Sequence, residues 1–167
     1  GFTTLAVSHL DDRDRVKDYL TKILASGNHL LSLINDILDM SRIESGKIQL
    51  DETEVNLSDV LHDIKTIVSG QIYAKQLDLY MDAIDITDED VYCDKTRLNQ
   101  VLMNLLSNAI KFTPAGGTVS LRVRQLAGQV SGCGQYEFRV KDSGIGMSPE
   151  FAQKIFEPFE RERTSTV

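Results

Sequence analysis

Three polar residues, Asn104, Asn108 and Lys111, are spaced four and three positions apart, so on a helix they lie on one face. An amide oxygen suits Mg²⁺, a hard cation that takes few protein ligands and keeps several waters. A lysine ammonium is a compact point charge that suits a phosphate. The spacing therefore indicates a site for a metal-chelated phosphate group.

The polar face extends along the predicted helix 94–111, with members Arg97, Gln100, Asn104, Asn108 and Lys111. On an arbitrary helix such a face would simply be solvated, and this alternative stays open. Two features favour a pocket. The face is rich in amides rather than in the Lys and Glu that usually coat exposed helices. The remaining positions are apolar, namely Leu98, Val101, Leu102, Leu105, Leu106, Ala109 and Ile110. We expect these apolar residues to seat the helix and the polar face to line a pocket.

A D-x-G-x-G run follows about thirty residues later, at 142–146. Gly144 and Gly146 permit positive φ angles and close approach of the backbone to a ligand. Asp142 follows a predicted buried strand with Phe138 and Val140, which places the carboxylate at a strand end facing a pocket. There it can accept a hydrogen bond from an exocyclic amine such as that of adenine. Many turns share this pattern, however, and capping of the turn is the alternative role.

Two phenylalanines, Phe156 and Phe159, stand in a polar tail that is rich in arginine. They serve either to attach the preceding loop to the core or as the hinge and latch of a mobile lid over a ligand. The residues alone do not choose between the two.

The composition limits the class of protein. A chain of 167 residues with 41% hydrophobic and 26% charged residues fits one soluble domain with an accessory element, or two small domains. The net charge of −7 argues against nucleic-acid binding. No apolar run reaches the ~18 residues of a membrane span, so no membrane contact is expected. Cys93 and Cys133 lack zinc-site spacing, which favours reduced thiols in the cytoplasm. Because the chain has no initiator Met, we expect a fragment.

The first 45 residues predict a helical hairpin. A heptad-like period runs from Arg13 to Glu44, with Asp11 and Asp12 placed where an N-cap is wanted and Gly46 where the helix should stop. Phe2 to Ser8 reads as the end of another helix. The apolar seam comprises Val16, Leu20, Ile23, Gly27, Leu30, Ile34, Ile37 and Ser41. Such a face needs cover, either from the rest of the chain or from a second copy in a dimeric four-helix bundle.

The downstream periods predict an α+β layer sandwich with helices on one face of a mixed sheet. The expected order is a strand at 47–54, a helix from 56 to about 70, a strand at 77–81, an acidic turn at 85–90, a short strand at 91–93, the helix 94–111, and paired strands at 118–125 and 136–141.

These pieces, in this order, resemble the sensor histidine kinases of two-component systems. The segments LLSLINDILDMSRIESGKIQL, NLLSNAIKFTP, DSGIGM and FEPF carry the resemblance, which covers essentially the whole chain. It implies that residues 1–46 are part of the dimerisation and histidine-phosphotransfer hairpin. Residues 47–167 would be a catalytic ATP-binding domain of the Bergerat type, incomplete at its C-terminus.

The resemblance also implies roles within an ATP and Mg²⁺ site. Asn108 would ligate the metal, Lys111 would contact phosphate, Asp142 would read adenine, Gly144 and Gly146 would begin the ATP lid, and Phe156 and Phe159 would form the phenylalanine box. ATP-hydrolysing relatives carry a Glu four residues before the metal-binding Asn. Here that position is Asn104, whose amide cannot act as a general base. This favours catalysis by Asn104 and Lys111 of phosphoryl transfer to a protein side chain.

Two departures from the family pattern stand out. The acceptor box H-[ED]-x-x-[TS]-P is not in the sequence, and His9, His29 and His62 are not expected to replace its histidine. The acceptor should lie before Gly1, and the second glycine box should follow Val167. As written, the chain could not complete autophosphorylation.

The leading hypothesis is a fragment of a homodimeric, cytoplasmic histidine kinase whose parent could be membrane-anchored. It would pass a phosphoryl group from ATP to a histidine and then to an aspartate of a response regulator. The alternatives are an ATPase or serine kinase of the same superfold, and a non-catalytic dimerisation scaffold with a vestigial pocket.

Overall fold

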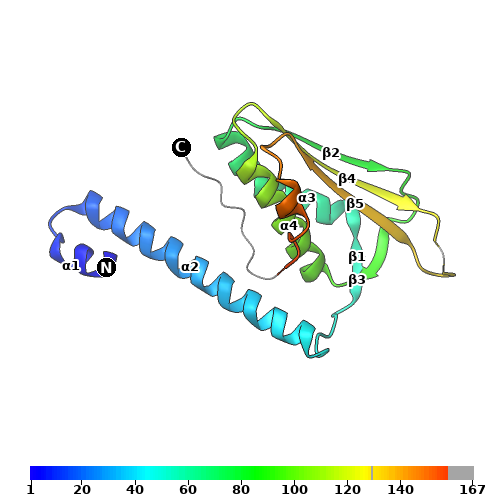
Figure 1. Cartoon of the computed structure of the whole chain (residues 1–167), viewed down its shortest axis with the longest axis horizontal. Helices are drawn as coiled ribbons and strands as arrows, with labels where there is room; N and C mark the ends of the chain where they lie inside the picture. Colours follow the sequence, from blue (N-terminus) through cyan, green and yellow to red (C-terminus); the bar gives the residue numbers. More distant parts are fainter. Residues whose placement is uncertain (129, 158–167) are drawn as a thin grey trace. The chain divides into compact units, whose positions relative to one another are not determined.

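A computed structural model describes residues 1–128 and 130–157 of the chain (Figure 1). The chain divides into two compact units, Gly1–Gln49 and Leu50–Val167. Each unit has its own set of secondary-structure elements.

Unit 1 is the predicted helical hairpin, formed by α1 (Phe2–Ser8) and α2 (Arg13–Glu44). The Asp12 side chain caps α2 by accepting a hydrogen bond from the Arg15 N–H at 3.1 Å, and Gly46 follows the helix with a φ of +66°. The Phe2 ring stacks on Tyr19 of α2, with 6.2 Å between the ring centroids. Both predicted helices are therefore confirmed, and α2 has the bounds that its capping residues indicated.

The apolar face of α2 is uncovered within this unit. No residue of α2 is buried, although the helix carries Leu20, Leu24, Leu30, Leu31, Leu33, Ile34, Ile37 and Leu38, all at least 42% exposed. Exposed apolar area on this scale is typical of a helix that packs against another partner.

Unit 2 is the predicted sandwich. Its elements are β1 (Thr53–Asn56), α3 (Leu57–Ala74), β2 (Asp78–Ile84), β3 (Asp90–Cys93), α4 (Lys95–Phe112), β4 (Thr118–Leu126), β5 (Gln135–Asp142) and α5 (Pro149–Ala152). The strands form a two-stranded antiparallel sheet, β1–β3, and a three-stranded sheet of order β2–β4–β5. In the larger sheet β2 is parallel to β4, and β4 is antiparallel to β5.

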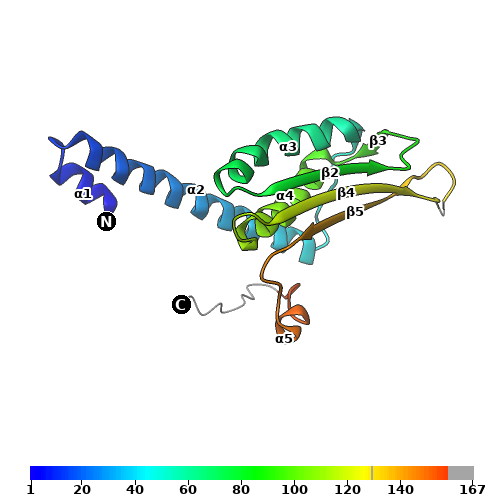
Figure 2. The ribbon, with the colours of Figure 1, turned by 90° about the horizontal axis from the view of Figure 1, so that it is seen from above.

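Helices α3 and α4 cover one face of the larger sheet (Figure 2). Alternation along β4 explains this, because Val119, Leu121 and Val123 are buried whereas Ser120 and Arg122 are on the other face. The core joins Val119 and Leu121 to Val60, Ile64 and Val68 of α3 and to Leu102, Leu106 and Ile110 of α4. The α+β prediction with helices on one face of a mixed sheet is confirmed.

Three predicted bounds are wrong. The strand expected at 77–81 continues to Ile84, because its pairing with β4 extends to the Ile84–Arg124 partners. The strand expected at 47–54 begins only at Thr53, because pairing with β3 starts at the Thr53–Cys93 partners and the alternating residues before it have no paired strand. Helix α3 continues past Gly70 to Ala74, since Ile72 extends the buried face. It ends where Gln76 takes a φ of +55°.

In the described part of the chain, no helix has both the length and the apolar character needed to span a bilayer.

Candidate functional site

Helix α4 starts at a tightly held cap. The Asp94 carboxylate accepts hydrogen bonds from the Arg97 N–H at 3.0 Å and from the Asp51 N–H at 3.1 Å. These hydrogen bonds lower the pKa of Asp94 from its ordinary value, and the bond from Arg97 has the largest effect. An ionised carboxylate at a helix N-terminus also suits the positive end of the helix dipole. The cap fixes where α4 begins, and hence which side chains lie on each of its faces.

The predicted polar face lies on the outer side of α4. Asn104, Asn108 and Lys111 are all exposed, whereas Leu102, Leu106, Ala109 and Ile110 are buried against the core. The Lys111 ammonium lies 5.0 Å from the centroid of the Phe112 ring. The structure therefore brings the two asparagines and the lysine together on one accessible face.

The apolar part of the prediction needs correction at two positions. Val101 and Leu105 were expected to help seat the helix, but they are 56% and 46% exposed. The reason is geometric, because the buried positions 102, 106, 109 and 110 define one stripe and positions 101 and 105 fall outside it. Two apolar side chains thus lie beside the asparagines on the surface.

The D-x-G-x-G loop follows β5 and is tied to the end of α4. The Ile145 N–H donates to the Phe112 carbonyl at 3.3 Å, and the Ser143 N–H donates to the Thr118 carbonyl at 3.0 Å. Asp142 Oδ1 accepts a hydrogen bond from the Gly144 N–H at 2.8 Å. The turn-capping role of Asp142 is therefore present, and its recognition of adenine stays a prediction.

The two glycines of this loop are required for different reasons. A Cβ on Gly144 would lie 2.8 Å from the Phe112 carbonyl oxygen and 2.6 Å from Asp142 Oδ1, so the loop could not pack as closely. Gly146 has a φ of +72°, which residues with a side chain rarely adopt, and a Cβ there would meet open space. Close packing at Gly144 and backbone conformation at Gly146 set the path of the loop.

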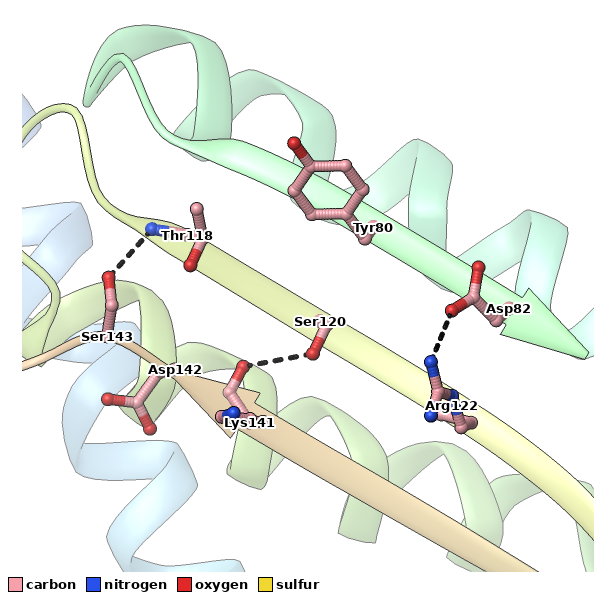
Figure 3. A pocket seen from close by; sticks show the side chains of 8 residues that line it. All are labelled: Tyr80, Asp82, Thr118, Ser120, Arg122, Lys141, Asp142 and Ser143. Carbon is pink, nitrogen blue, oxygen red and sulfur yellow. Dashed lines mark hydrogen bonds and ion pairs between the residues drawn. The ribbon is translucent and has the colours of Figure 1, made fainter.

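A cavity of about 470 Å³ lies on the face of the larger sheet opposite the helices (Figure 3). Its lining consists of Tyr80, Asp82, Thr118, Ser120, Arg122, Lys141, Asp142 and Ser143. Asp142 is the predicted site residue among them, and the polar residues of α4 are not part of this lining. The pocket expected beside Asn104 and Asn108 is therefore not this cavity, and it stays a prediction.

The phenylalanine pair is described in part. One of its two predicted roles was to attach the loop to the core. Phe156 is 96% exposed and does not do so. Phe159 lies outside the described residues. Helix α5 precedes Phe156 and is capped by Ser148, whose Oγ accepts a hydrogen bond from the Phe151 N–H at 3.2 Å. The role in a lid stays a prediction for both phenylalanines.

The histidines and cysteines belong to segments other than α4 and the D-x-G-x-G loop. His9 is in the turn between α1 and α2, where its Nδ1 lies 2.9 Å from the Leu5 carbonyl oxygen, and His62 is exposed on α3. Cys93 and Cys133 are both free thiols. Among residues 1–128 and 130–157, no three His, Cys, Asp or Glu side chains form a group that could hold a metal ion.

The structure adds one basic residue to this region, Lys75, which no sequence pattern indicates. The Lys75 ammonium donates to the carbonyls of Ile110 and Lys111, at 2.7 Å each. These carbonyls lie 35 and 36 residues further along the chain, so no local pattern could have revealed the contact.

Two protein families match the chain, in the order that the fold suggests. The family described as "His Kinase A (phospho-acceptor) domain" matches residues 1–46. The family described as "Histidine kinase-, DNA gyrase B-, and HSP90-like ATPase" matches residues 93–167. The first match covers most of unit 1, and the second covers unit 2 from residue 93 onward.

The chain is also similar in sequence to bacterial sensor proteins. The sensor protein GacS of Pseudomonas syringae pv. syringae is 40% identical over 159 residues, which cover 95% of this chain and 17% of GacS. The chain spans about a fifth of the length of such curated relatives.

Solved structures show the same fold. The histidine kinase ThkA in complex with the response regulator protein TrrA matches with a TM-score of 0.69 and 27% identity, over 96% of this chain and 45% of that chain. Full-length ShkA in complex with AMPPNP matches with a TM-score of 0.65 and 31% identity, over 81% of this chain and 28% of that chain. From the two family matches and these relatives, the chain belongs to the sensor histidine kinases of two-component systems.

Proposed function

We propose that this chain is the part of a sensor histidine kinase that binds Mg-ATP and directs its γ-phosphoryl group to a histidine outside residues 1–167. The phosphoryl group would then pass to an aspartate of a response regulator. The observation that carries the proposal is the junction between α4 and the D-x-G-x-G loop, where an exposed amide and lysine face adjoins a glycine loop fixed by the Phe112 carbonyl.

Each predicted site residue has a role in this proposal. Asn108 supplies an amide oxygen to Mg²⁺, and Lys111 supplies positive charge to the phosphates. Asp142 accepts a hydrogen bond from the adenine amine, while Gly144 and Gly146 form the base of the lid. Mg²⁺ bound with nucleotide takes only one or two protein ligands, so a single amide on an exposed helix face fits it.

The chemistry asks little of the protein beyond positioning. A histidine imidazole is nucleophilic at neutral pH and needs no strong base, which agrees with an amide at Asn104. The remaining work is to hold the triphosphate in line with the acceptor and to offset its charge. Val101 and Leu105, exposed beside the asparagines, offer an apolar surface on which a closed lid could exclude water.

The partners follow from the same reading. Residues 1–46 would form a homodimeric four-helix bundle through the exposed apolar face of α2, and residues 47–167 would be the ATP-binding domain. A receiver domain is proposed as the phosphoryl acceptor, supported by the ThkA structure with its response regulator. Use of ATP and free thiols agree with a cytoplasmic location. Nucleic-acid binding is not proposed for a chain with a net charge of −7.

The test is labelling of the full-length protein with γ-³²P-ATP. We expect an acid-labile, base-stable label that maps N-terminal to Gly1, and we expect Asn108→Ala to reduce it to background. Thr96→Ala, on the exposed first turn of the same helix, is the matched control and should label normally. Acid-stable label would indicate a hydroxyl acceptor, and no binding of Mg-ATP would indicate a scaffold with a vestigial pocket.

A further inference from the structure

The last turn of α4 is held by a cation from another helix. Lys75, the C-cap residue of α3, is partly buried and donates from its Nζ to the carbonyl oxygens of Ile110 and Lys111, at 2.7 Å each. The last four carbonyls of a helix have no partner within the helix, and the C-terminal end carries partial negative charge. A lysine ammonium therefore satisfies two of these carbonyls and also complements the helix dipole.

The two neighbouring carbonyls also have partners, one from the C-cap residue of α4 and one from the glycine loop. The buried Thr113 hydroxyl donates to the Ala109 carbonyl at 2.6 Å. The Ile145 N–H, in the D-x-G-x-G loop, donates to the Phe112 carbonyl at 3.3 Å. The final turn of α4 is thus linked both to α3, through Lys75, and to the glycine loop, through Ile145.

The backbone around Lys75 is itself held by hydrogen bonds. The Leu77 N–H donates to the Ile72 carbonyl at 3.0 Å and closes the end of α3. The Gln76 carbonyl accepts a hydrogen bond from the Gly116 N–H at 2.9 Å, which ties this turn to the segment that follows α4. These two hydrogen bonds fix the backbone of the turn that contains Lys75. The position from which its side chain extends toward α4 is therefore fixed as well.

We propose that Lys75 is a positioning residue for the nucleotide site. It holds the last turn of α4, which carries Asn108 and Lys111, in the orientation that the ligand requires, and through Phe112 it also sets the glycine loop. Lys75 acts through backbone carbonyls rather than by touching the substrate. The expected effect of Lys75 on ATP binding rests on the proposed function. The two hydrogen bonds from Lys75 to the end of α4, which we call the clamp, are present without a ligand.

The test compares Lys75→Met, which keeps the length of the side chain but removes the charge and the donors, with Lys75→Arg, which keeps both. Lys65→Met is the matched control, because Lys65 is exposed on the same helix α3. Two quantities are measured on the chain: hydrogen exchange of the Ile145 amide without ligand, and the Kd for Mg-ATP by calorimetry. Exchange of the Leu121 amide, in the central strand, reports global unfolding.

We expect Lys75→Met to accelerate Ile145 exchange about tenfold more than Leu121 exchange, and to raise the Kd for Mg-ATP about five- to tenfold, because fewer molecules hold a competent last turn. Lys75→Arg should stay within about twofold of wild type in both measurements, because a charged N–H donor is retained, and Lys65→Met should change neither.

The proposal is overturned if Lys75→Met behaves like Lys65→Met, or if Ile145 and Leu121 exchange accelerate by the same factor, which would mean general destabilisation. If Lys75→Met does not fold, the same two measurements on Lys75→Gln decide in the same way. Failure of the wild-type chain to bind Mg-ATP would refute the proposed function, and the exchange of Ile145 would still decide whether the clamp exists.

Discussion

Replacement of Gly144 by alanine tests whether the glycine loop must pack on the end of α4. The added Cβ would lie 2.8 Å from the Phe112 carbonyl oxygen, 3.1 Å from the Phe112 carbonyl carbon and 2.6 Å from Asp142 Oδ1. Two of these are backbone atoms of a helix end that other groups hold in place. The loop must therefore move away, and the hydrogen bond from the Ile145 N–H to Phe112 is lost or stretched.

The magnitude follows from these contacts. Overpacking costs about 1–3 kcal/mol and a lost hydrogen bond about 0.5–1.5 kcal/mol, whereas alanine recovers about 0.4–1 kcal/mol by restricting the unfolded chain. We expect a net destabilisation of about 2 kcal/mol. With an m-value of about 2 kcal/mol/M in urea, the unfolding midpoint should fall by about 1 M.

The assay is urea denaturation followed by tyrosine fluorescence, because Tyr73, Tyr80, Tyr92 and Tyr136 all lie in unit 2. Gly70→Ala is the matched control. A Cβ at this position in α3 would meet nothing within 4 Å, so the substitution should stabilise the protein by about 0.5–1 kcal/mol. A Gly144→Ala variant as stable as wild type would refute the reasoning, since the loop would then not need its close approach to Phe112.

Three further predictions follow from the structure. Gln76→Gly should stabilise the protein by about 0.5–1 kcal/mol in thermal denaturation, because Gln76 has a φ of +55° that favours glycine; an unchanged or lower stability would contradict this. Because its hydrogen bonds lower the folded-state pKa of Asp94, that carboxylate stabilises the fold above its ordinary pKa of 3.8, and the stability is lost as pH falls through the lower folded value. Asp94→Asn, which keeps a capping oxygen, should therefore flatten the acid limb of a plot of Tm against pH, and an unaltered limb would count against the cap. Ile34→Glu on the exposed face of α2 should dissociate the proposed dimer in sedimentation experiments, whereas Asn35→Asp on the same helix should not; a dimer that survives Ile34→Glu would place the interface elsewhere.

The sequence predicted elements well where the signals were local. Asp12 and Gly46 bound α2, and Asp94 begins α4, because capping side chains and glycines act within a few residues of the backbone groups they satisfy. The sequence does not predict the end of α3, because Gly70 is typical of a helix stop but lies on the exposed face of a helix that continues to Ala74.

Non-local pairing explains the other differences. The start of β1 depends on which residues of β3 it meets, and Ile48 has no partner strand even though it alternates. The polar face of α4 was predicted from spacing alone, but the exposure of Leu105 depended on the placement of the sheet. The clamp by Lys75 could not be predicted, since its acceptors are far away in the sequence and its side chain gives no periodic signal.

The most direct test of the central claim is a titration of the chain with Mg-ATP, monitored by the amide chemical shifts in NMR spectra. If the outer face of α4 and the glycine loop form the nucleotide site, the largest shifts should fall on Asn108, Lys111 and Gly144. Shifts concentrated instead at Ser120 and Arg122, in the cavity on the opposite face of the sheet, would contradict the assignment.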